Sequence, residues 1–152
     1  MKNRATIVAL GVLLVALAAS CSTFEQDWKA SGPEPESYYT LTGRWEGRWT
    51  CDQTGHEGDL RCIVTHLRRN HYELRYWASW SVFESEYTMS MTVDWRRGAF
   101  EFTGAKDLGF WFGGLCRFEG RATPTEFVTS YESESNQGQF LMHRVGELEA
   151  GD

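Results

Sequence analysis

Hydrophobic and polar residues alternate along most of the chain from residue 41 onward. In the segment 43–51, glycine, tryptophan and cysteine occupy the odd positions, and arginine, glutamate and threonine occupy the even ones. This period of two predicts a β-strand, because an amphipathic helix would place its apolar residues three or four apart. A helix would also carry Gly43 and Gly47 in its interior, at a cost of about 1 kcal/mol each. We therefore expect the first strand of a sheet here.

The same alternation recurs in later segments, and no window of this region has a convincing helical period. Turn-forming residues separate most of the segments, at 54–59, 69–70, 96–98, 122–124 and 135–138, whereas the connection near 81–84 has no clear turn residue. The further segments with a period of two are 60–64, 72–80, 87–93, 100–102, 116–120, 127–131 and 140–144. The pattern predicts an all-β domain of about eight short antiparallel strands.

The strand pattern favours closure into a barrel. An open sheet would expose two edges, and closure removes them. A Greek-key sandwich would need a long crossover, which the chain does not offer between residues 43 and 145. We therefore expect a single closed up-and-down barrel over residues 41–146, with a flexible tail at 147–152. A barrel of eight strands has room for side chains or for one small ligand.

Residues at both ends of the expected barrel resemble a known fold group. Gly43-x-Trp45 on the first strand, with Arg144 on the last, is similar to the calycins, which comprise lipocalins, fatty-acid-binding proteins and avidins. The resemblance covers about residues 41–145. It implies that Gly43, Trp45 and Arg144 close one end of the barrel, with Arg144 packed across Trp45. The chain lacks the Thr-Asp-Tyr type motif and the C-terminal helix of full lipocalins, so the resemblance implies a fold more than a ligand.

The N-terminal residues 1–20 predict a signal peptide. Lys2 and Arg4 precede an uncharged apolar run, 5–19, which has the length of a signal-peptide core and is short for a membrane span. The segment Leu17-Ala18-Ala19-Ser20-Cys21 resembles a bacterial lipobox and implies that Cys21 carries a lipid anchor. The alternative is an ordinary cleaved signal with a chance cysteine. Ser22 resembles the residue that sends enterobacterial lipoproteins to the outer membrane, so we expect the protein there, facing the periplasm.

Residues 21–40 predict a disordered tether between the anchor and the barrel. The segment 31–37 contains two prolines, a glycine and acidic residues without an apolar period. Trp28 is the exception, and we expect it at the lipid headgroups or against the domain. The whole chain has a formal charge of −6, and removal of the signal peptide takes away two further positive charges. An acidic surface of this kind excludes nucleic acid as a partner.

The cysteines suggest a disulfide. With Cys21 acylated, an odd number of thiols remains in an oxidising compartment: Cys51, Cys62 and Cys116. Cys51 and Cys62 flank the first hairpin on the same face, so a bridge between them is our preferred interpretation. A bridge between Cys51 and Cys116 is the alternative.

Catalytic and metal-binding motifs are weak. The four histidines form no His-Glu-x-x-His motif, and no serine or cysteine lies in a nucleophile elbow. His56 lies among Asp52, Glu57 and Asp59, where a solvated turn is favoured over a metal site. We expect neither enzyme activity nor a cofactor. The apolar stretch 107–114 is either a lip at the barrel mouth or the buried start of a strand.

Aromatic residues on the inward face carry the functional expectation. We expect the walls of a ligand site to include Trp49, Tyr76, Trp80, Tyr87, Phe102, Phe127 and Tyr131. The first hypothesis is a lipid-anchored module that binds a small apolar or aromatic ligand. The second is a packed barrel without a ligand that serves as a structural or protein-interaction lipoprotein of the envelope. An enclosed apolar void of a few hundred Å³ would favour the first.

Overall fold

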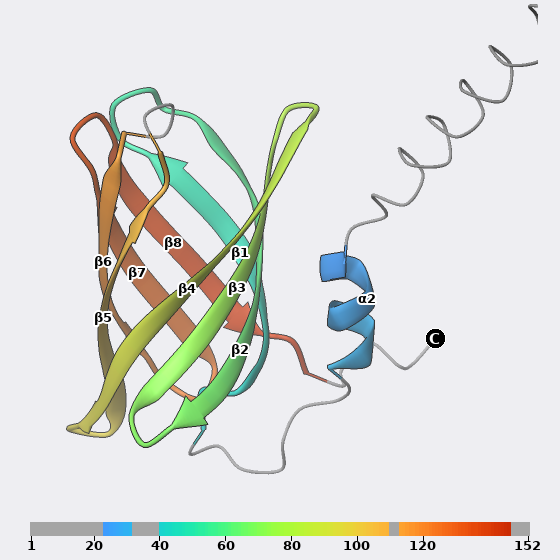
Figure 1. Ribbon diagram of the computed structural model, residues 1–152, viewed down its shortest axis with the longest axis vertical. Helices are drawn as coiled ribbons and strands as arrows, with labels where there is room; N and C mark the ends of the chain where they lie inside the picture. Colours follow the sequence, from blue (N-terminus) through green and yellow to red (C-terminus); the bar gives the residue numbers. More distant parts are fainter. Residues whose placement is uncertain (1–22, 32–39, 110–112, 147–152) are drawn as a thin grey trace, which may run out of the picture. The chain divides into compact units, whose positions relative to one another are not determined.

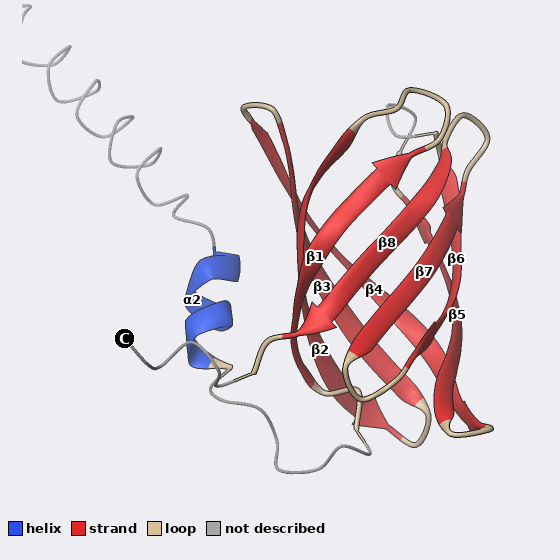
Figure 2. Ribbon diagram, turned by 180° about the vertical axis from the view of Figure 1, so that it is seen from behind, coloured by secondary structure: helices blue, strands red, loops and turns tan. Residues whose placement is uncertain are grey.

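A computed structural model of the chain describes residues 23–31, 40–109 and 113–146. In the last two ranges, eight antiparallel strands form a closed barrel in which each strand pairs with the next along the chain (Figures 1 and 2). The strands are β1 (Gly43–Cys51), β2 (Glu57–Arg68), β3 (His71–Trp80), β4 (Phe83–Arg96), β5 (Ala99–Asp107), β6 (Leu115–Ala122), β7 (Glu126–Glu132) and β8 (Gln137–Arg144). The predicted fold class, a single closed up-and-down barrel, is confirmed.

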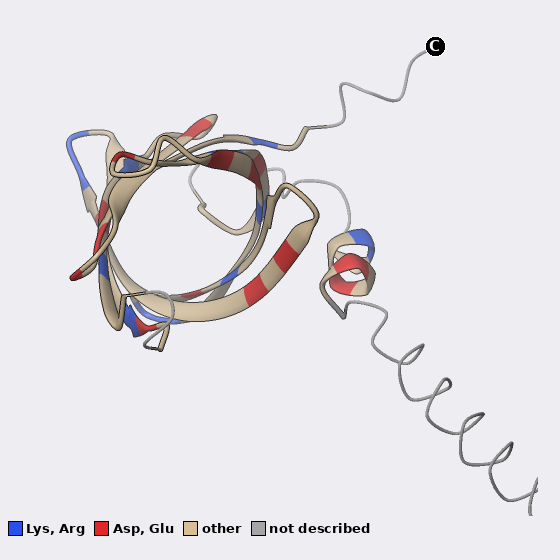
Figure 3. Cartoon of the chain, turned by 90° about the horizontal axis from the view of Figure 1, so that it is seen from above, with Lys and Arg blue, Asp and Glu red and all other residues tan. Residues whose placement is uncertain are grey.

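Closure depends on pairing between the first and last strands. β1 pairs with β8 from Trp45 opposite Arg144 to Cys51 opposite Gly138, so the strands form a complete ring when viewed along the barrel (Figure 3). Gly47 makes the close approach possible. A Cβ atom at this position would lie 1.9 Å from the carbonyl oxygen of Leu141.

Three hairpins use two-residue turns with left-handed backbone. Arg69 has φ 49°, Ser81 has φ 56°, and Arg97 and Gly98 have φ 51° and 80°. Such turns match the right-handed twist of the flanking strands. The sequence signals the Arg97-Gly98 turn through its glycine, whereas the Ser81-Val82 turn between β3 and β4 has no residue that favours positive φ.

The segment predicted as a tether contains a short helix, α2 (Thr23–Ala30), which the sequence pattern did not predict. Lys29 and Glu25 form an ion pair at 3.6 Å with the spacing of one helical turn, and the rings of Phe24 and Trp28 stack at 5.7 Å. Both pairs stabilise a helix through contacts between residues four apart. The remainder of the expected tether, 32–39, lies outside the described residues, as do the expected signal peptide, Cys21 and the expected tail at 147–152.

The helix and the barrel belong to separate compact units of the chain. Among the described residues, no helix is long and apolar enough to cross a membrane.

Candidate ligand site

The barrel interior is lined by apolar side chains from alternate positions of all eight strands. Trp45, Tyr76 and Phe127 have no exposed surface, and Thr129 is the one fully buried polar residue among those described. The other buried side chains of this core are Leu41, Leu60, Cys62, Val64, Leu74, Met89, Met91, Val93, Phe100, Phe102, Cys116, Phe118, Ala122, Phe140 and Met142. The period of two thus places most of the predicted residues on the predicted face.

One end of the barrel is closed by Trp45 and Arg144. The guanidinium carbon of Arg144 lies 4.3 Å from the centre of the Trp45 ring, a cation–π contact. Arg144 also donates hydrogen bonds to the carbonyl oxygens of Thr42 and Pro124, at 2.9 and 2.7 Å. The indole N–H of Trp45 donates to the carbonyl oxygen of Leu41 at 3.0 Å. The contact that the calycin resemblance implied is therefore present.

Gly43 begins β1 at this closed end. Its φ of 127° lies in a region that favours glycine, and its Cα is opposite Val64 on β2. Any side chain here would strain the backbone just before the Trp45 plug.

Phe102 and Phe127 pack at the closed end. The Phe127 ring lies 5.3 Å from Trp45 and 4.7 Å from Phe102, and both phenylalanines are buried. These two predicted ligand-binding residues therefore contact the plug, and their rings support it.

A second cluster of rings lies further along the barrel, around Phe140. The ring of Phe140 contacts Tyr131 at 5.0 Å, Tyr76 at 5.6 Å and Phe118 at 6.0 Å. Tyr76 in turn stacks on Tyr87 at 5.0 Å. These distances are those of direct ring contact, so the middle of the barrel is filled by aromatic side chains.

Three aromatic side chains at the other end of the barrel are half-buried and pack against the core from its edge: Trp49, Tyr87 and Tyr131. Trp49 donates its indole N–H to the carbonyl oxygen of Ser79 at 2.9 Å, and Tyr131 donates its hydroxyl to that of Thr50 at 2.8 Å. These bonds fix both rings. We call this end, which carries the β1–β2, β3–β4, β5–β6 and β7–β8 connections, the open end.

Two buried hydroxyls in the interior have no oxygen or nitrogen hydrogen-bond partner among the described residues, and one of them interacts with the Cys62 thiol instead. They belong to Tyr76 and Thr129. Burial raises the pKa of both Tyr76 and Tyr87 well above the usual range, so both phenols are neutral at physiological pH. An unpaired buried hydroxyl costs about 1–3 kcal/mol, and a polar atom of a bound molecule would recover part of this.

Trp80 does not line the barrel, contrary to the prediction. It is 42% exposed at the end of the β3–β4 hairpin, where its ring lies 4.7 Å from His56 and 6.0 Å from Phe83. The hairpin extends past the wall of the barrel (Figure 1). A side chain on the inward face of the strand therefore has no barrel interior to pack into at this position.

The predicted disulfide between Cys51 and Cys62 is not formed, and neither is the alternative with Cys116, because all three thiols are free. The register explains the first result. Cys62 is opposite Trp45, and Cys51 lies further along β1, at a distance of about 20 Å at the rise of a strand. A disulfide needs Cα atoms within about 7 Å. The prediction that Cys51 and Cys62 lie on the same face of the sheet was correct, but the two residues lie at different positions along the barrel axis.

The sulfur of Cys51 lies in a polar turn. Burial raises the pKa of this thiol, but hydrogen bonds from the Thr54 side chain and from the backbone at Thr54 and Gln53 outweigh it and lower the pKa below the usual value. In contrast, burial raises the pKa of Cys116 to about 11 and that of Cys62 well above the usual range.

A hollow of about 560 Å³ on β5 to β8 reaches Tyr131, one of the three rings at the open end, but it is open to solvent and is not the enclosed apolar void expected of a ligand pocket. Phe118 and Tyr131 supply its aromatic surface, and Arg117, Glu119 and Glu132 belong to its polar border. Of the predicted ligand-binding residues, only Tyr131 lines it.

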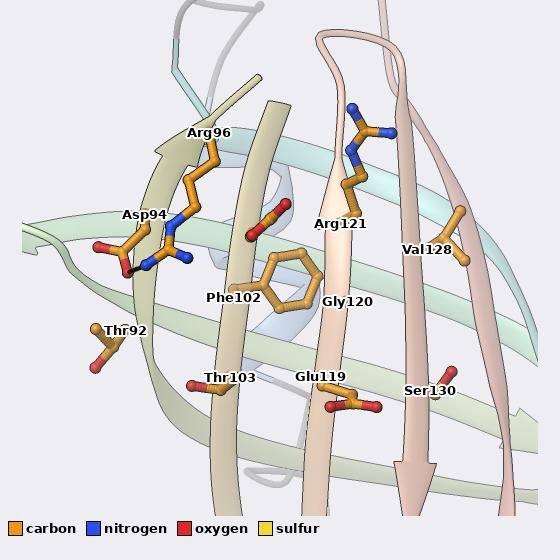
Figure 4. A pocket seen from close by; sticks show the side chains of 11 residues that line it. Thr92, Asp94, Arg96, Phe102, Thr103, Glu119, Gly120, Arg121, Val128 and Ser130 are labelled. Atoms are coloured by element: carbon orange, nitrogen blue, oxygen red, sulfur yellow. Dashed lines mark ion pairs between the residues drawn. The ribbon is translucent and has the colours of Figure 1, made fainter. Parts of the chain in front are cut away.

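A second hollow, of about 500 Å³, lies beside the first on the outer face of β4 to β7 (Figure 4). Its floor is formed around Phe102 and Gly120, with Arg96 and Arg121 toward one end and Glu119 toward the other. Arg96 pairs with Asp94 at 3.5 Å, and both side chains are exposed. The charges here are mixed and solvated, so the surface is unsuited to an apolar ligand.

The stretch 107–114 connects β5 to β6 at the open end. β5 ends at Asp107 and β6 begins at Leu115, and the described residues between them, 108–109 and 113–114, belong to neither strand. Leu108 packs against the core, whereas Leu115 is 46% exposed. Residues 110–112 lie outside the described residues.

No group of histidine, cysteine and acidic residues in the described ranges is arranged to hold a metal ion. Comparisons with protein-family models, curated proteins and solved structures gave no match. The barrel topology is compatible with a calycin-like fold.

Proposed function

We propose that the protein is a lipid-anchored binding module of the cell envelope that takes up a small apolar or aromatic ligand at the open end of its barrel. The observation that carries this proposal is the asymmetry of the aromatic interior. Rings at the closed end are completely buried around Trp45, whereas Trp49, Tyr87 and Tyr131 keep part of their surface exposed. Half-buried aromatic rings are typical of a surface that binds apolar molecules.

The polar groups near these rings support a ligand with few hydrogen-bonding atoms. The donors of Trp49 and Tyr131 are already used by backbone carbonyl groups. The hydroxyl groups of Tyr76 and Thr129 have no described oxygen or nitrogen partner, but they lie deeper among apolar side chains. A ligand with one polar end could satisfy one of them after displacing a ring. The anchor at Cys21 and the outer-membrane location are part of the proposal, and they depend on the lipobox resemblance and on Ser22, respectively.

The second candidate function is a packed barrel that acts in structure or protein interaction, without a ligand. The observation in its favour is the density of the middle of the barrel, where ring centres lie 5.0–6.5 Å apart around Phe140, Phe118 and Tyr131. Binding would then require these rings to move.

The test is a titration of the full chain in nanodiscs with fatty acids of increasing length and with an aromatic dye, read by tryptophan fluorescence. We expect a saturable signal, after subtraction of empty nanodiscs, that weakens at least several-fold in Trp49→Ala. The matched control is Trp95→Ala, which removes an indole that is 48% exposed outside the interior cluster. Equal binding by both variants, or no saturable signal from any of these ligands, would favour the packed-barrel function.

A further inference from the structure

Only part of strand β4 pairs with β5. β4 runs from Phe83 to Arg96, but its described register with β5 covers only Met91 to Arg96. On the other side of the gap, β5 continues from Ala105 to Asp107 in register with β6 alone. The two strands therefore diverge toward the open end, where the β3–β4 hairpin leans away from β5 (Figures 1 and 2). The first half of β4 is a sheet edge within an otherwise closed barrel.

One hydrogen bond shows which backbone N–H and C=O groups of β4 point toward β3 and which point away from it. The N–H of Val93 donates to the carbonyl oxygen of Asn70, on the β3 side. In an antiparallel pair, the N–H and C=O groups of one residue point to the same neighbour, and successive residues alternate. The register of β4 with β3 has no shift between Thr92 and Phe83. The backbone groups of Glu84 and Thr88 therefore point away from β3, and no described strand pairs with them there.

The side chains along this edge separate into an apolar face and an acidic one. Phe83 and Tyr87 alternate with Glu84 and Glu86, and Phe83 is 65% exposed. Glu86 is paired with Arg75 at 3.2 Å, and Glu84 accepts a long hydrogen bond from the Trp77 indole at 3.4 Å. Across the gap, exposed Lys106 and Asp107 on β5 add one charge of each sign, so the net charge of the edge comes from its glutamates.

We propose that this edge of β4 binds an extended segment of another protein in which apolar residues alternate with lysine or arginine. Backbone groups of Glu84 and Thr88 would supply the hydrogen bonds of an added strand, and Phe83 and Tyr87 would receive its apolar side chains. Opposite charges directly across a pair of strands are favourable, so the acidic face selects basic side chains. This inference does not depend on the ligand proposed above.

A second copy of the chain is a poorer occupant. Pairing of two β4 edges would bring the glutamates of both copies onto one face, in a protein whose formal charge is already −6. Like charges that face each other across strands are destabilising. The charge of the edge therefore favours a basic partner.

The experiment uses the full chain in nanodiscs and a blocked ten-residue peptide of alternating valine and lysine. We expect saturable binding, with hydrogen exchange at the amides of Glu84 and Thr88 slowed at least tenfold. The same peptide with every backbone amide N-methylated keeps the charge but cannot form strand hydrogen bonds, so it should not bind. A peptide of alternating valine and glutamate should bind more weakly than the lysine peptide.

Two variants test the position. Thr88→Pro removes an N–H that the β3 ladder does not use and should abolish peptide binding, with folding checked by near-ultraviolet circular dichroism. Glu84→Lys should weaken binding about two- to fivefold, the range for one cross-strand pair, and the matched control Glu101→Lys should have no effect. Equal binding of the N-methylated peptide, or equal effects of the two charge reversals, would overturn the proposal. A dimer of the chain alone that protects the Glu84 and Thr88 amides would assign the edge to a second copy instead.

Discussion

The three cysteines of the barrel differ in what surrounds each sulfur atom. Cys51 lies in a turn whose hydrogen-bond donors favour the thiolate, so its pKa is lowered. Cys116 and Cys62 lie among apolar side chains, which favour the neutral thiol and raise the pKa. The thiolate is the nucleophile, so these differences in pKa predict an order of reactivity. Exposure predicts no order, because all three residues are buried.

We expect iodoacetamide to alkylate Cys51 first in the folded protein at about pH 8, where an unperturbed thiol is only partly ionised. The rate at Cys116 should keep rising as the pH approaches its pKa of about 11, whereas the rate at Cys51 should level off at lower pH. Peptide mapping by mass spectrometry measures each site, with urea-unfolded protein as the control. Faster alkylation of Cys62 than of Cys51 in the folded state would contradict these environments.

At the level of strands, glycines on the inward face allow the backbones to approach closely. A Cβ atom at Gly47 would lie 2.7 Å from the Cα of Met142, and one at Gly138 would lie 1.8 Å from the carbonyl oxygen of Thr50. Both positions are on the β1–β8 pair that closes the barrel. The alternation of glycine and tryptophan in β1 is thus a packing requirement of closure.

Gly47→Ala should destabilise the barrel by about 2–3 kcal/mol, because the atoms that a methyl group would strike belong to the backbone and cannot rotate away. Gly146→Ala is the control, since no atom lies within 4 Å of a Cβ at that position. Its effect should stay within about 0.5 kcal/mol. Urea unfolding of the full chain measures both, and similar midpoints for the two variants would disprove the role of Gly47 in closure.

At the level of the whole molecule, the barrel has a closed end and an open end, and the chain enters at the closed one. Leu41 is buried beside the Trp45 plug, just before β1 begins. A lipid anchor at Cys21 would therefore connect to the barrel through its closed end. The open-end rings and the β4 edge would then be far along the barrel from the point of attachment.

We expect Cys21→Ser to abolish incorporation of labelled palmitate and to change the membrane fractionation of the protein. The reason is chemical, since acylation of a lipobox cysteine needs its thiol. Cys116→Ser is the matched control, because it removes a thiol from the barrel and should leave acylation unchanged. Equal labelling of both variants would refute the anchor and, with it, the proposed location.

The sequence alone predicted the features that depend on local pattern. A period of two defines which face each residue occupies, so the eight strands and the inward position of most aromatic residues followed from counting. The Gly43-x-Trp45 motif and Arg144 indicated the plug, because this contact joins the two strands that closure must make neighbours. Helix α2 was missed, although Glu25 with Lys29 and Phe24 with Trp28 have the spacing of one helical turn.

Only the tertiary structure decided the height of each residue along the barrel axis. Phe127 lies against Trp45 and Tyr131 lies at the open end, although both are inward aromatic residues of the same strand. Cys51 and Cys62 share a face but not a height, and the β3–β4 hairpin extends past the wall and carries Trp80 out of the interior. The physical reason is that alternation specifies a side of the sheet, whereas height depends on the register of every strand with its neighbours. That register is set by closure of the whole ring, which no single segment encodes.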